Sequence, residues 1–355
     1  MKVLIAAGGT GGHLYPGIAI AREVLAEAGN TVVFAGTGRG IEARVLPAEG
    51  LPVRFITVGK LKGMGPAAKL RTLVTLPASI AQAAGLLRQE RPDVVLGVGG
   101  YASGPVALAA WLRRVPLVIV EPNSYAGLAN RMLGRLAKQV FVCFPGMDRQ
   151  GFFPAAKKVL LGPLVRKGIE AGDRGTALTA FGLEPGRFTV LVMGGSGGAH
   201  AINMAMKDAA QELAAVPGLQ VLHQTGEKDV QEVAAGYREA GVITAVVPYI
   251  SDMAGAYAAA DLVVCRSGAT TVAELAVCGK RSVLVPYPFA ADNHQEHNAR
   301  SLAARGGAEV IVQKDLTGER IAGVIRRFAA AGRQRAEPMA STAAKEIVRA
   351  CKAYV

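Results

Sequence analysis

The sequence has few aromatic residues and no long apolar run. Aromatic residues are 5% of the 355 residues while hydrophobic residues are 51%, a balance typical of an Ala-, Val- and Leu-rich α/β protein. No stretch approaches the roughly 18 consecutive apolar residues of a membrane-spanning helix. Because Met1-Lys2 leads directly into an apolar run, we expect no secretory signal peptide. These absences favour a cytoplasmic protein, and the length of 355 residues suggests two domains.

Cysteine is also scarce, and its spacing excludes the common metal and redox motifs. Cys143, Cys265, Cys278 and Cys351 form no C-x-x-C pair and have no neighbouring histidines suited to zinc. We expect them to be small core residues in a reducing compartment.

Acidic residues are few in the N-terminal half. Residues 1–165 hold 19 Lys and Arg against 8 Asp and Glu, a net charge of +11, whereas residues 166–355 hold 21 against 19, a net charge of +2. A basic domain favours nucleic acid, an anionic membrane or an anionic substrate. The basic stretches lack interleaved aromatic residues and nucleic-acid motifs, so no nucleic-acid partner is expected.

What the sequence does contain is a glycine-rich stretch that occurs twice. Residues 2–13, KVLIAAGGTGGH, indicate a buried parallel strand and a glycine turn, followed by a helix predicted over 16–28. Residues 189–199, TVLVMGGSGGA, repeat the pattern, with His13 matched by Ala199. Such a unit presents backbone N–H groups and the positive end of a helix to an anion. One copy could be only a tight turn, but two copies indicate two similar α/β domains.

Strands and helices alternate along the rest of the chain, which predicts doubly wound parallel sheets. The predicted strands are 3–7, 31–35, 53–58, one from 92, 116–120, 140–143, 189–193, 219–223, 245–247, 262–265, 283–286 and 309–312. A linker is expected at 144–168, and a last helix at 340–353 could fold back on the first domain. The domains are therefore predicted as 1–163 completed by 339–355, and 164–338.

A helix expected over 67–90, with a kink at Pro77, follows a basic loop at 60–65. The simpler interpretation is an amphipathic helix packed on its sheet. The alternative is a membrane-facing patch. That patch would consist of Leu76, Ile80, Lys69, Arg71 and Arg88.

Polar side chains follow several predicted strands at their carboxyl ends, where doubly wound sheets bind ligands. His13, Ser103 and Asn123 each hold such a position. We therefore expect them to share one cleft.

Six motifs in order carry a family resemblance. They are GGTGGH (8–13), GGYASGP (99–105), a turn at 121–123, GGSGGA (194–199), CRSGATTVAE (265–274) and DNHQEHNA (292–299). In this order the chain resembles the MurG family of peptidoglycan glycosyltransferases over essentially its whole length. The resemblance implies a GT-B type α/β fold, two Rossmann-like doubly wound parallel-sheet domains facing across a cleft. It also implies a peripheral protein on the cytoplasmic face of the cell membrane, with the oligomeric state undetermined.

The resemblance further implies an inverting transfer without cofactor or metal. N-acetylglucosamine would move from UDP-N-acetylglucosamine (UDP-GlcNAc) to the 4-hydroxyl of undecaprenyl-pyrophosphoryl-N-acetylmuramyl-pentapeptide. His13 is the best candidate for the base, since its ordinary pKa is near 6.5, although it could instead only cap or orient its loop. Glu121 is the second candidate, as base or as an orienting partner. The acceptor-binding residues would be Gly99, Gly100, Tyr101 and Ser103.

The donor site is expected mainly in the second domain. Residues 267–271 follow a strand and open a helix, so their N–H groups and hydroxyls can hold the diphosphate, and Glu274 can accept hydrogen bonds from the ribose. By resemblance, Ile250 would clamp the uracil, Gln295 and Asn123 would bind sugar hydroxyls, and Ser196 and Arg166 would contact the diphosphate. The full set of predicted donor-binding residues is Thr10, Gly11, Gly12, Asn123, Arg166, Ser196, Ile250, Ser267, Gly268, Ala269, Thr270, Thr271, Val272, Ala273, Glu274 and Gln295.

The sequence departs from the family pattern at Val120, Pro122 and Gly197, where the family commonly has His, Gln and Gln. These changes put in doubt any role of the missing side chains. A metal site around Asp292, His294 and His297 is the weaker alternative, because the family resembles metal-independent transferases.

Three other functions are alternatives to this one. A related GT-B glycolipid glycosyltransferase would differ in its acceptor. A UDP-GlcNAc epimerase would need acid and base groups beside the sugar C2 and no lipid. A nucleotide-binding module without catalysis would bind UDP without turnover.

Overall fold

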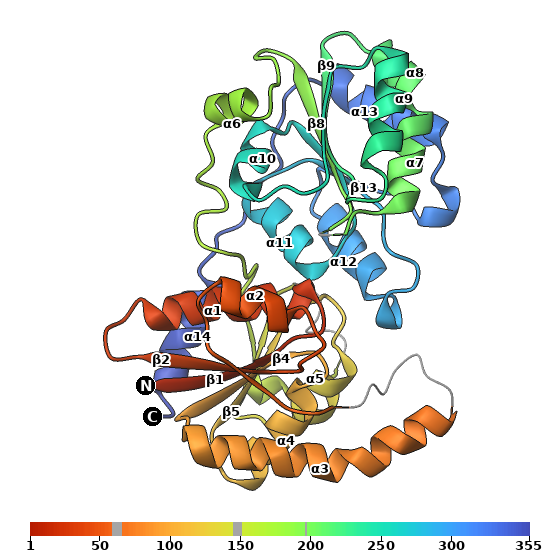
Figure 1. Cartoon of the computed structure of the whole chain (residues 1–355). Coiled ribbons are helices and arrows are strands. Elements are labelled where there is room, and N and C mark those ends of the chain that lie inside the picture. The colour runs from red at the N-terminus through yellow and green to blue at the C-terminus, as the bar shows by residue number, and fades with distance from the viewer. Residues whose placement is uncertain (59–65, 145–150, 196) are drawn as a thin grey trace. The chain divides into compact units, whose positions relative to one another are not determined.

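The structure, a computed structural model, describes residues 1–58, 66–144, 151–195 and 197–355, and of 66–74 only the backbone. The chain forms two compact units: unit 1 is residues 1–166 with 340–355, and unit 2 is residues 167–339. Each unit is a parallel sheet with helices on its faces (Figure 1). The loop predicted at 60–65 lies outside the described residues.

Unit 1 is built on a seven-stranded parallel sheet with the strand order β3-β2-β1-β4-β5-β6-β7. The strands are β1 (Lys2–Ala7), β2 (Thr31–Gly36), β3 (Val53–Phe55), β4 (Val94–Gly99), β5 (Leu117–Glu121), β6 (Gln139–Val142) and β7 (Lys158–Leu160). The central strands β4 and β5 are buried along their whole length. Near-continuous apolar runs of this kind form because both faces of the sheet are covered.

Helices cover the two faces of this sheet (Figure 1). They are α1 (Gly11–Leu25), α2 (Glu42–Ala48), α3 (Pro66–Glu90), α4 (Ser103–Leu112), α5 (Leu128–Leu133) and α14 (Ala343–Lys352). The last of these comes from the end of the chain and packs against α1. Its side chains Ile347, Val348 and Cys351 are buried. The C-terminal helix therefore completes unit 1.

Unit 2 has a six-stranded parallel sheet in the order β10-β9-β8-β11-β12-β13. Its strands are β8 (Phe188–Met193), β9 (Leu219–Gln224), β10 (Thr244–Val247), β11 (Leu262–Cys265), β12 (Ser282–Leu284) and β13 (Ala308–Val310). Its helices are α6 (Arg174–Ala180), α7 (His200–Asp208), α8 (Ala210–Ala214), α9 (Val230–Ala240), α10 (Met253–Ala259), α11 (Ala269–Val277), α12 (His294–Ala303) and α13 (Gly318–Ala330).

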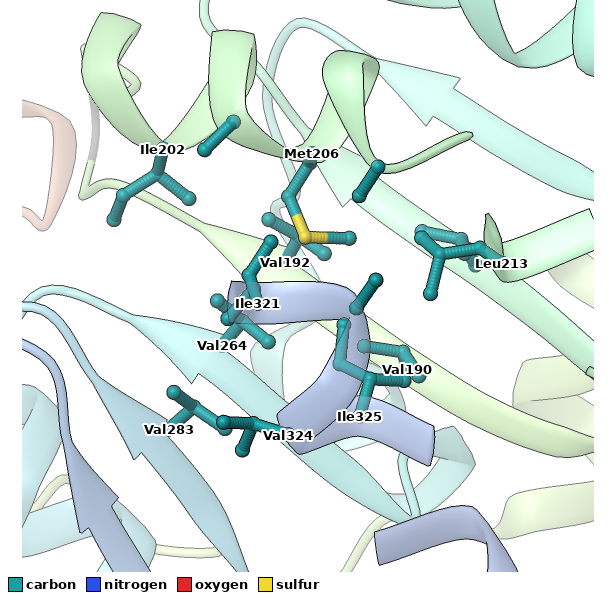
Figure 2. Close-up of a cluster of buried hydrophobic side chains, with 14 of the residues drawn as sticks. Val190, Val192, Ile202, Met206, Leu213, Val264, Val283, Ile321, Val324 and Ile325 are labelled. Carbon is teal, nitrogen blue, oxygen red and sulfur yellow. The ribbon is translucent and has the colours of Figure 1, made fainter. Parts of the chain in front are cut away.

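The core on one face of this sheet consists of aliphatic side chains from strands and helices. Figure 2 shows strand residues such as Val192 and Val264 packed against Met206 of α7 and Ile325 of α13. All four are fully buried. This packing holds the strands whose carboxyl ends carry the loops described below.

Three details differ from the sequence predictions. The first helix begins at Gly11 instead of Pro16, so Pro16 lies inside it and His13 lies in its first turn. The helix α2 and the short strand β7 were not predicted, and β7 lies within the stretch predicted to be a linker. Both are short elements with little periodicity, and β7 is defined by pairing with β6 rather than by its own three residues.

The membrane patch on α3 stays a prediction, and the packing of Ile80 agrees with the simpler interpretation of a helix packed on its sheet. Ile80 is half-buried and packs against the core of unit 1, and Leu76 is half-buried. The side chains of Lys69 and Arg71 lie outside the described residues. Within the described residues, no helix is long and apolar enough to span a membrane.

Candidate active site

Each sheet reverses its strand order at one point, between β1 and β4 in unit 1 and between β8 and β11 in unit 2. Doubly wound sheets bind ligands at the carboxyl ends of the strands beside such a point. The loops there are 8–10 and 100–102 in unit 1, and 194–199 and 266–268 in unit 2. Most of the residues predicted to form the site lie in these four loops or in the helices that follow them.

In unit 1 the two glycine loops lie against each other without space for side chains. A Cβ at Gly100 would lie 2.0 Å from the carbonyl oxygen of Gly8, and one at Gly9 would lie 3.3 Å from the ring of Tyr101. Gly9 and Gly100 also have positive φ angles, of 83° and 88°. The loops after β1 and β4 therefore need glycine for their backbone shape and for their close approach.

His13 lies at this contact, in the first turn of α1. Its Nδ1 atom is 3.1 Å from Oγ1 of Thr10, the N-cap residue. Its ring also lies against Gly99, where a Cβ would be 2.6 Å from Cδ2 and 2.9 Å from Nε2. The structure thus brings together His13, Thr10, Gly99, Gly100 and Tyr101 from two separate motifs.

Glu42 of α2 fixes the first glycine loop, and the sequence analysis did not identify it. Its buried carboxylate accepts hydrogen bonds from the N–H of Gly9 (2.9 Å) and from the N–H and Oγ1 of Thr37 (both 2.8 Å). Burial alone raises the pKa of Glu42, but these hydrogen bonds outweigh it, and the pKa is lowered overall. A Cβ at Gly8 would lie 2.6 Å from the carboxyl carbon. The available signal in the sequence was Gly36 and Gly40, which shortly precede Glu42 and leave space for its side chain.

Glu121, at the end of β5, is fully buried and has four hydrogen-bond donors. Oε1 accepts from the backbone N–H (3.0 Å) and Nδ2 (3.1 Å) of Asn123, and Oε2 accepts from the N–H of Gly127 and Nδ2 of Asn130 (both 2.9 Å). Burial nevertheless raises the pKa of Glu121. A carboxylate with both oxygens occupied in this way shapes the loop after β5, which favours the orienting role over that of a base.

Ser103 and Tyr101 follow β4 but differ in accessibility. Ser103 is fully buried, and its Oγ has no hydrogen-bond partner among the described residues. It lies beside Gly97, where a Cβ would be 3.0 Å from the hydroxyl. Tyr101 is 40% exposed. Of the two predicted acceptor-binding side chains, Tyr101 is therefore the one presented at the surface.

Arg166 is the last residue of the N-terminal part of unit 1, not part of unit 2. Its guanidinium lies 5.4 Å from the centre of the Tyr15 ring. Tyr15 in turn lies against Gly11, where a Cβ would be 3.3 Å from the ring. Arg166 is thus placed beside the start of α1.

In unit 2 the second glycine loop has a different shape from the first. Gly198 has a φ of 75°, and a Cβ there would lie 1.8 Å from the carbonyl oxygen of Thr225. The following helix, α7, begins only at His200, whereas α1 begins at Gly11, the position matched by Gly197. Ser196 lies outside the described residues.

The start of α11 is an open helix N-terminus beside the second glycine loop. Its N-cap residue Gly268 makes no side-chain capping hydrogen bond, and a Cβ there would meet no heavy atom within 4 Å. Ser267 is buried, and its Oγ donates to the carbonyl oxygen of Gln295 (2.8 Å). The side chain of Gln295 accepts from the N–H of Tyr287 (3.0 Å). Residues 269–271 form the first turn of α11, and the N-terminal turn of a helix is where proteins commonly bind anions.

Other predicted donor-site residues are largely buried. Glu274 is 3% exposed, and its Oε2 accepts a hydrogen bond from the hydroxyl of Tyr257 (3.0 Å). Val272 and Ala273 are core residues, and Ile250 is 3% exposed beside the exposed Tyr249. At these positions little side-chain surface is exposed to a ligand. No group of three or more His, Cys, Asp or Glu among the described residues is placed to hold a metal ion.

Comparison with protein families identifies the class. Residues 3–142 match the glycosyltransferase family 28 N-terminal domain, and residues 189–353 match the glycosyltransferase family 28 C-terminal domain. The protein is thus a glycosyltransferase with the GT-B fold, as predicted.

Comparison with individual proteins narrows the class. The chain is 48% identical over 366 aligned residues to the UDP-N-acetylglucosamine–N-acetylmuramyl-(pentapeptide) pyrophosphoryl-undecaprenol N-acetylglucosamine transferase of Anaeromyxobacter dehalogenans, covering 100% of this chain and 93% of that one. A crystal structure of Acinetobacter baumannii MurG is 32% identical with a TM-score of 0.77, covering 99% of both chains. The chain belongs to this family of N-acetylglucosamine transferases.

A further solved structure bears on one alternative. UDP-GlcNAc 2-epimerase from Neisseria meningitidis is 14% identical with a TM-score of 0.66, covering 98% of this chain and 99% of that one. Similarity at this level shows a shared fold alone, so the epimerase alternative is not favoured.

Proposed function

We propose that this glycosyltransferase transfers N-acetylglucosamine from UDP-GlcNAc to the 4-hydroxyl of undecaprenyl-pyrophosphoryl-N-acetylmuramyl-pentapeptide, with inversion at the anomeric carbon. The observation that carries the proposal is the similarity over the whole chain to a transferase whose name states this donor and acceptor. The product would be the disaccharide-lipid precursor of peptidoglycan.

In this proposal unit 2 binds the donor. The uncapped N-terminus of α11, with the hydroxyls of Thr270 and Thr271, would hold the diphosphate and stabilise the charge that develops on departing UDP. Glu274 would bind the ribose through a carboxylate oxygen, and the backbone at Ile250 would contact the uracil. Gln295, which is held by Tyr287, would bind the hydroxyls of the transferred sugar.

His13 would act as the base in unit 1. The tautomer in which Nδ1–H donates to Oγ1 of Thr10 gives Nε2 the lone pair that can take the proton of the acceptor hydroxyl. Contact of the imidazole with Gly99 fixes the ring plane. Glu121 would orient Asn123 for a contact with the donor sugar, and Tyr101 would contact the acceptor.

We also place the enzyme at the cytoplasmic face of the membrane as a peripheral protein. Residues 1–165, most of unit 1, carry a net charge of +11, which would attract an anionic lipid surface. At the end of α4, Trp111 (47% exposed) and Leu112 (59% exposed) precede the exposed Arg113 and Arg114. An exposed apolar pair beside two cations suits a bilayer interface.

The decisive experiment follows UDP release from UDP-GlcNAc with and without a short-chain muramyl-pyrophosphoryl-lipid acceptor. The proposal expects release only with the acceptor, together with a disaccharide-lipid product. If the protein binds UDP but produces no UDP from UDP-GlcNAc in the presence of this acceptor, the proposal is contradicted. Diacylglycerol acceptors would then test the glycolipid alternative.

A membrane-binding assay tests the location separately. Sedimentation with vesicles containing anionic lipid should recover more protein than sedimentation with neutral vesicles, and added salt should reduce the difference. Equal recovery with both kinds of vesicle would contradict the electrostatic attraction.

A further inference from the structure

A cavity of about 560 Å³ lies in unit 2 at the amino ends of β11 and β12. The loops of the candidate active site lie at the opposite, carboxyl ends of the same strands. The cavity volume is within the range of small-molecule binding sites. Its lining includes Asp261, just before β11, and Lys280, just before β12.

Two walls of the cavity are connecting segments of the chain, residues 169–174 and 333–338, and the others come from α10 and the end of α11. These segments lie next to the two positions at which the chain passes between units. The second segment is pinned to the end of α11, because the N–H of Ala336 donates to the carbonyl oxygen of Gly279 (3.0 Å). The first lies against α10, where a Cβ at Gly172 would be 2.2 Å from the carbonyl oxygen of Ala254. Two sides of the cavity are therefore backbone held by contacts with neighbouring elements, and the cavity is open to solvent.

A buried lysine lines this cavity, and no carboxylate in the described part of the chain forms an ion pair with it. Lys280 is 8% exposed, and its Nζ donates to the carbonyl oxygen of Ala260 (2.8 Å). Burial lowers the pKa of Lys280 to about 8; the nearby charges of Arg335 and Arg174 add to this lowering, and Cys278 and Asp261 oppose it. A buried ammonium group paired only with a carbonyl is costly in the absence of a counter-charge.

The one buried acid in the lining is already bound by other groups. Asp261 accepts hydrogen bonds from Arg174 (2.9 Å) and from the N–H of Thr189 (2.8 Å), and it lies 3.5 Å from Arg333. The lining contains four cationic side chains, Arg174, Lys280, Arg333 and Arg335, and two acidic ones, Asp261 and Glu170. A positive excess therefore remains around Lys280 and Arg335.

We propose that this cavity binds a small molecule carrying a phosphate or diphosphate group, with Lys280 and Arg335 as its charged contacts. Phosphate oxygens accept strong charge-assisted hydrogen bonds from lysine and arginine. The volume exceeds that of the anion alone, and Ile169, Val277 and Pro338 offer an apolar surface to an organic part of the ligand. The site is separate from the donor site and does not depend on the proposed function.

Calorimetric titration with inorganic pyrophosphate tests the proposal. Saturating UDP is present throughout, so that the donor site does not contribute heat. Binding should be weakened about tenfold or more in Lys280→Gln and in Arg335→Gln, the loss expected when a charged hydrogen-bond donor is removed. Arg305→Gln, which removes an exposed arginine outside the cavity, should bind pyrophosphate like the original protein.

Unchanged UDP affinity shows that each variant is folded. If Lys280→Gln does not fold, Arg335→Gln still tests the proposal, because Arg335 is exposed. No binding in the presence of UDP, or equal affinity in all four proteins, would overturn the proposal. Sulfate, whose charge is constant between pH 7 and 9, gives a second readout. Its affinity should fall over this range in the original protein and stay level in Lys280→Gln.

Discussion

At the scale of single residues, two side chains with different tasks lie where the loop after β1 contacts the loops after β2 and β4. Glu42 is buried and accepts hydrogen bonds from two loops, so it fixes backbone shape. His13 is half-buried at the same contact and carries an imidazole that can take a proton. We therefore expect substitution of Glu42 to reduce stability and substitution of His13 to reduce turnover.

Replacing His13 by Ala should reduce turnover by about 10²–10⁴-fold, the range of general-base contributions, with UDP affinity retained. The reason is that the lost imidazole would be the proton acceptor, while the proposed contacts with UDP are mainly in unit 2. Steady-state UDP release and UDP titration measure the two effects. Thr10→Ala, which removes only the partner of Nδ1, should cost less. Turnover of His13→Ala within tenfold of the original protein would leave this histidine an orienting role only.

Glu42→Gln should lower the free energy of unfolding by about 1–3 kcal/mol at pH 7, because one amide NH₂ group would face N–H donors. The pKa of Glu42 is lowered in the folded state, so its stabilisation is present above the ordinary value of 4.5. The difference between the two proteins should shrink as the pH falls below 4.5 and the carboxylate takes up a proton. Urea unfolding at several pH values measures this.

Glu49→Gln is the matched control, since Glu49 is exposed and bonded to the exposed Arg22. It should change stability by less than about 1 kcal/mol. If the loss of unfolding free energy in Glu42→Gln did not depend on pH, the charge of the carboxylate would not be the cause of the stabilisation.

At the scale of elements, the two glycine loops show that a repeated sequence need not give a repeated conformation. Gly12 lies within α1, whereas the matching Gly198 has a positive φ and lies against Thr225. The difference arises because the second loop packs on the loop after β9, and α7 therefore starts later. Hence the roles of corresponding glycines must be tested one by one.

Gly198→Ala should lower the stability of unit 2 by more than about 1–2 kcal/mol, because a Cβ is unfavourable at positive φ and would overlap the carbonyl of Thr225. Gly197→Ala is the neighbouring control, since a Cβ there meets no atom within 4 Å. Gly197→Gln, which restores the side chain usual in the family, should be equally well tolerated for the same reason. Thermal unfolding compares the three variants, and equal midpoints for Gly198→Ala and Gly197→Ala would contradict this account.

At the scale of the whole molecule, the chain begins and ends in the same unit. The helix α14 supplies buried Ile347 and Val348 to unit 1, and Lys352 forms an ion pair with Glu27 of that unit. The ion pair is exposed at the surface and stabilises little, so burial of the apolar side chains dominates.

Truncation after residue 342 should therefore destabilise unit 1 by about 3–6 kcal/mol, the value of burying two aliphatic side chains. Removal of residues 353–355, which follow α14, should have little effect. Calorimetric unfolding measures stability, and UDP titration reports on unit 2, which should keep its affinity. An unchanged unfolding profile after removal of α14 would contradict a structural role for this helix.

Much of the fold could be predicted from the sequence, because parallel strands that are buried on both faces have apolar sequences, several of which end in glycine. The alternation of such runs with helices predicted two parallel sheets, and the ordered motifs predicted the family. The scarcity of acidic residues in the first half was enough by itself to assign the positive charge to that half.

The tertiary structure alone decided which groups meet. The contacts of His13 with Gly99, of Glu42 with Gly9 and of Arg166 with Tyr15 join residues far apart in the chain. The burial of Ser103 and Glu121 and the cavity at Lys280 likewise depend on neighbours from several elements. Local sequence patterns record which face of a strand or helix is apolar, whereas desolvation and hydrogen bonding of a side chain are set by the elements that pack around it.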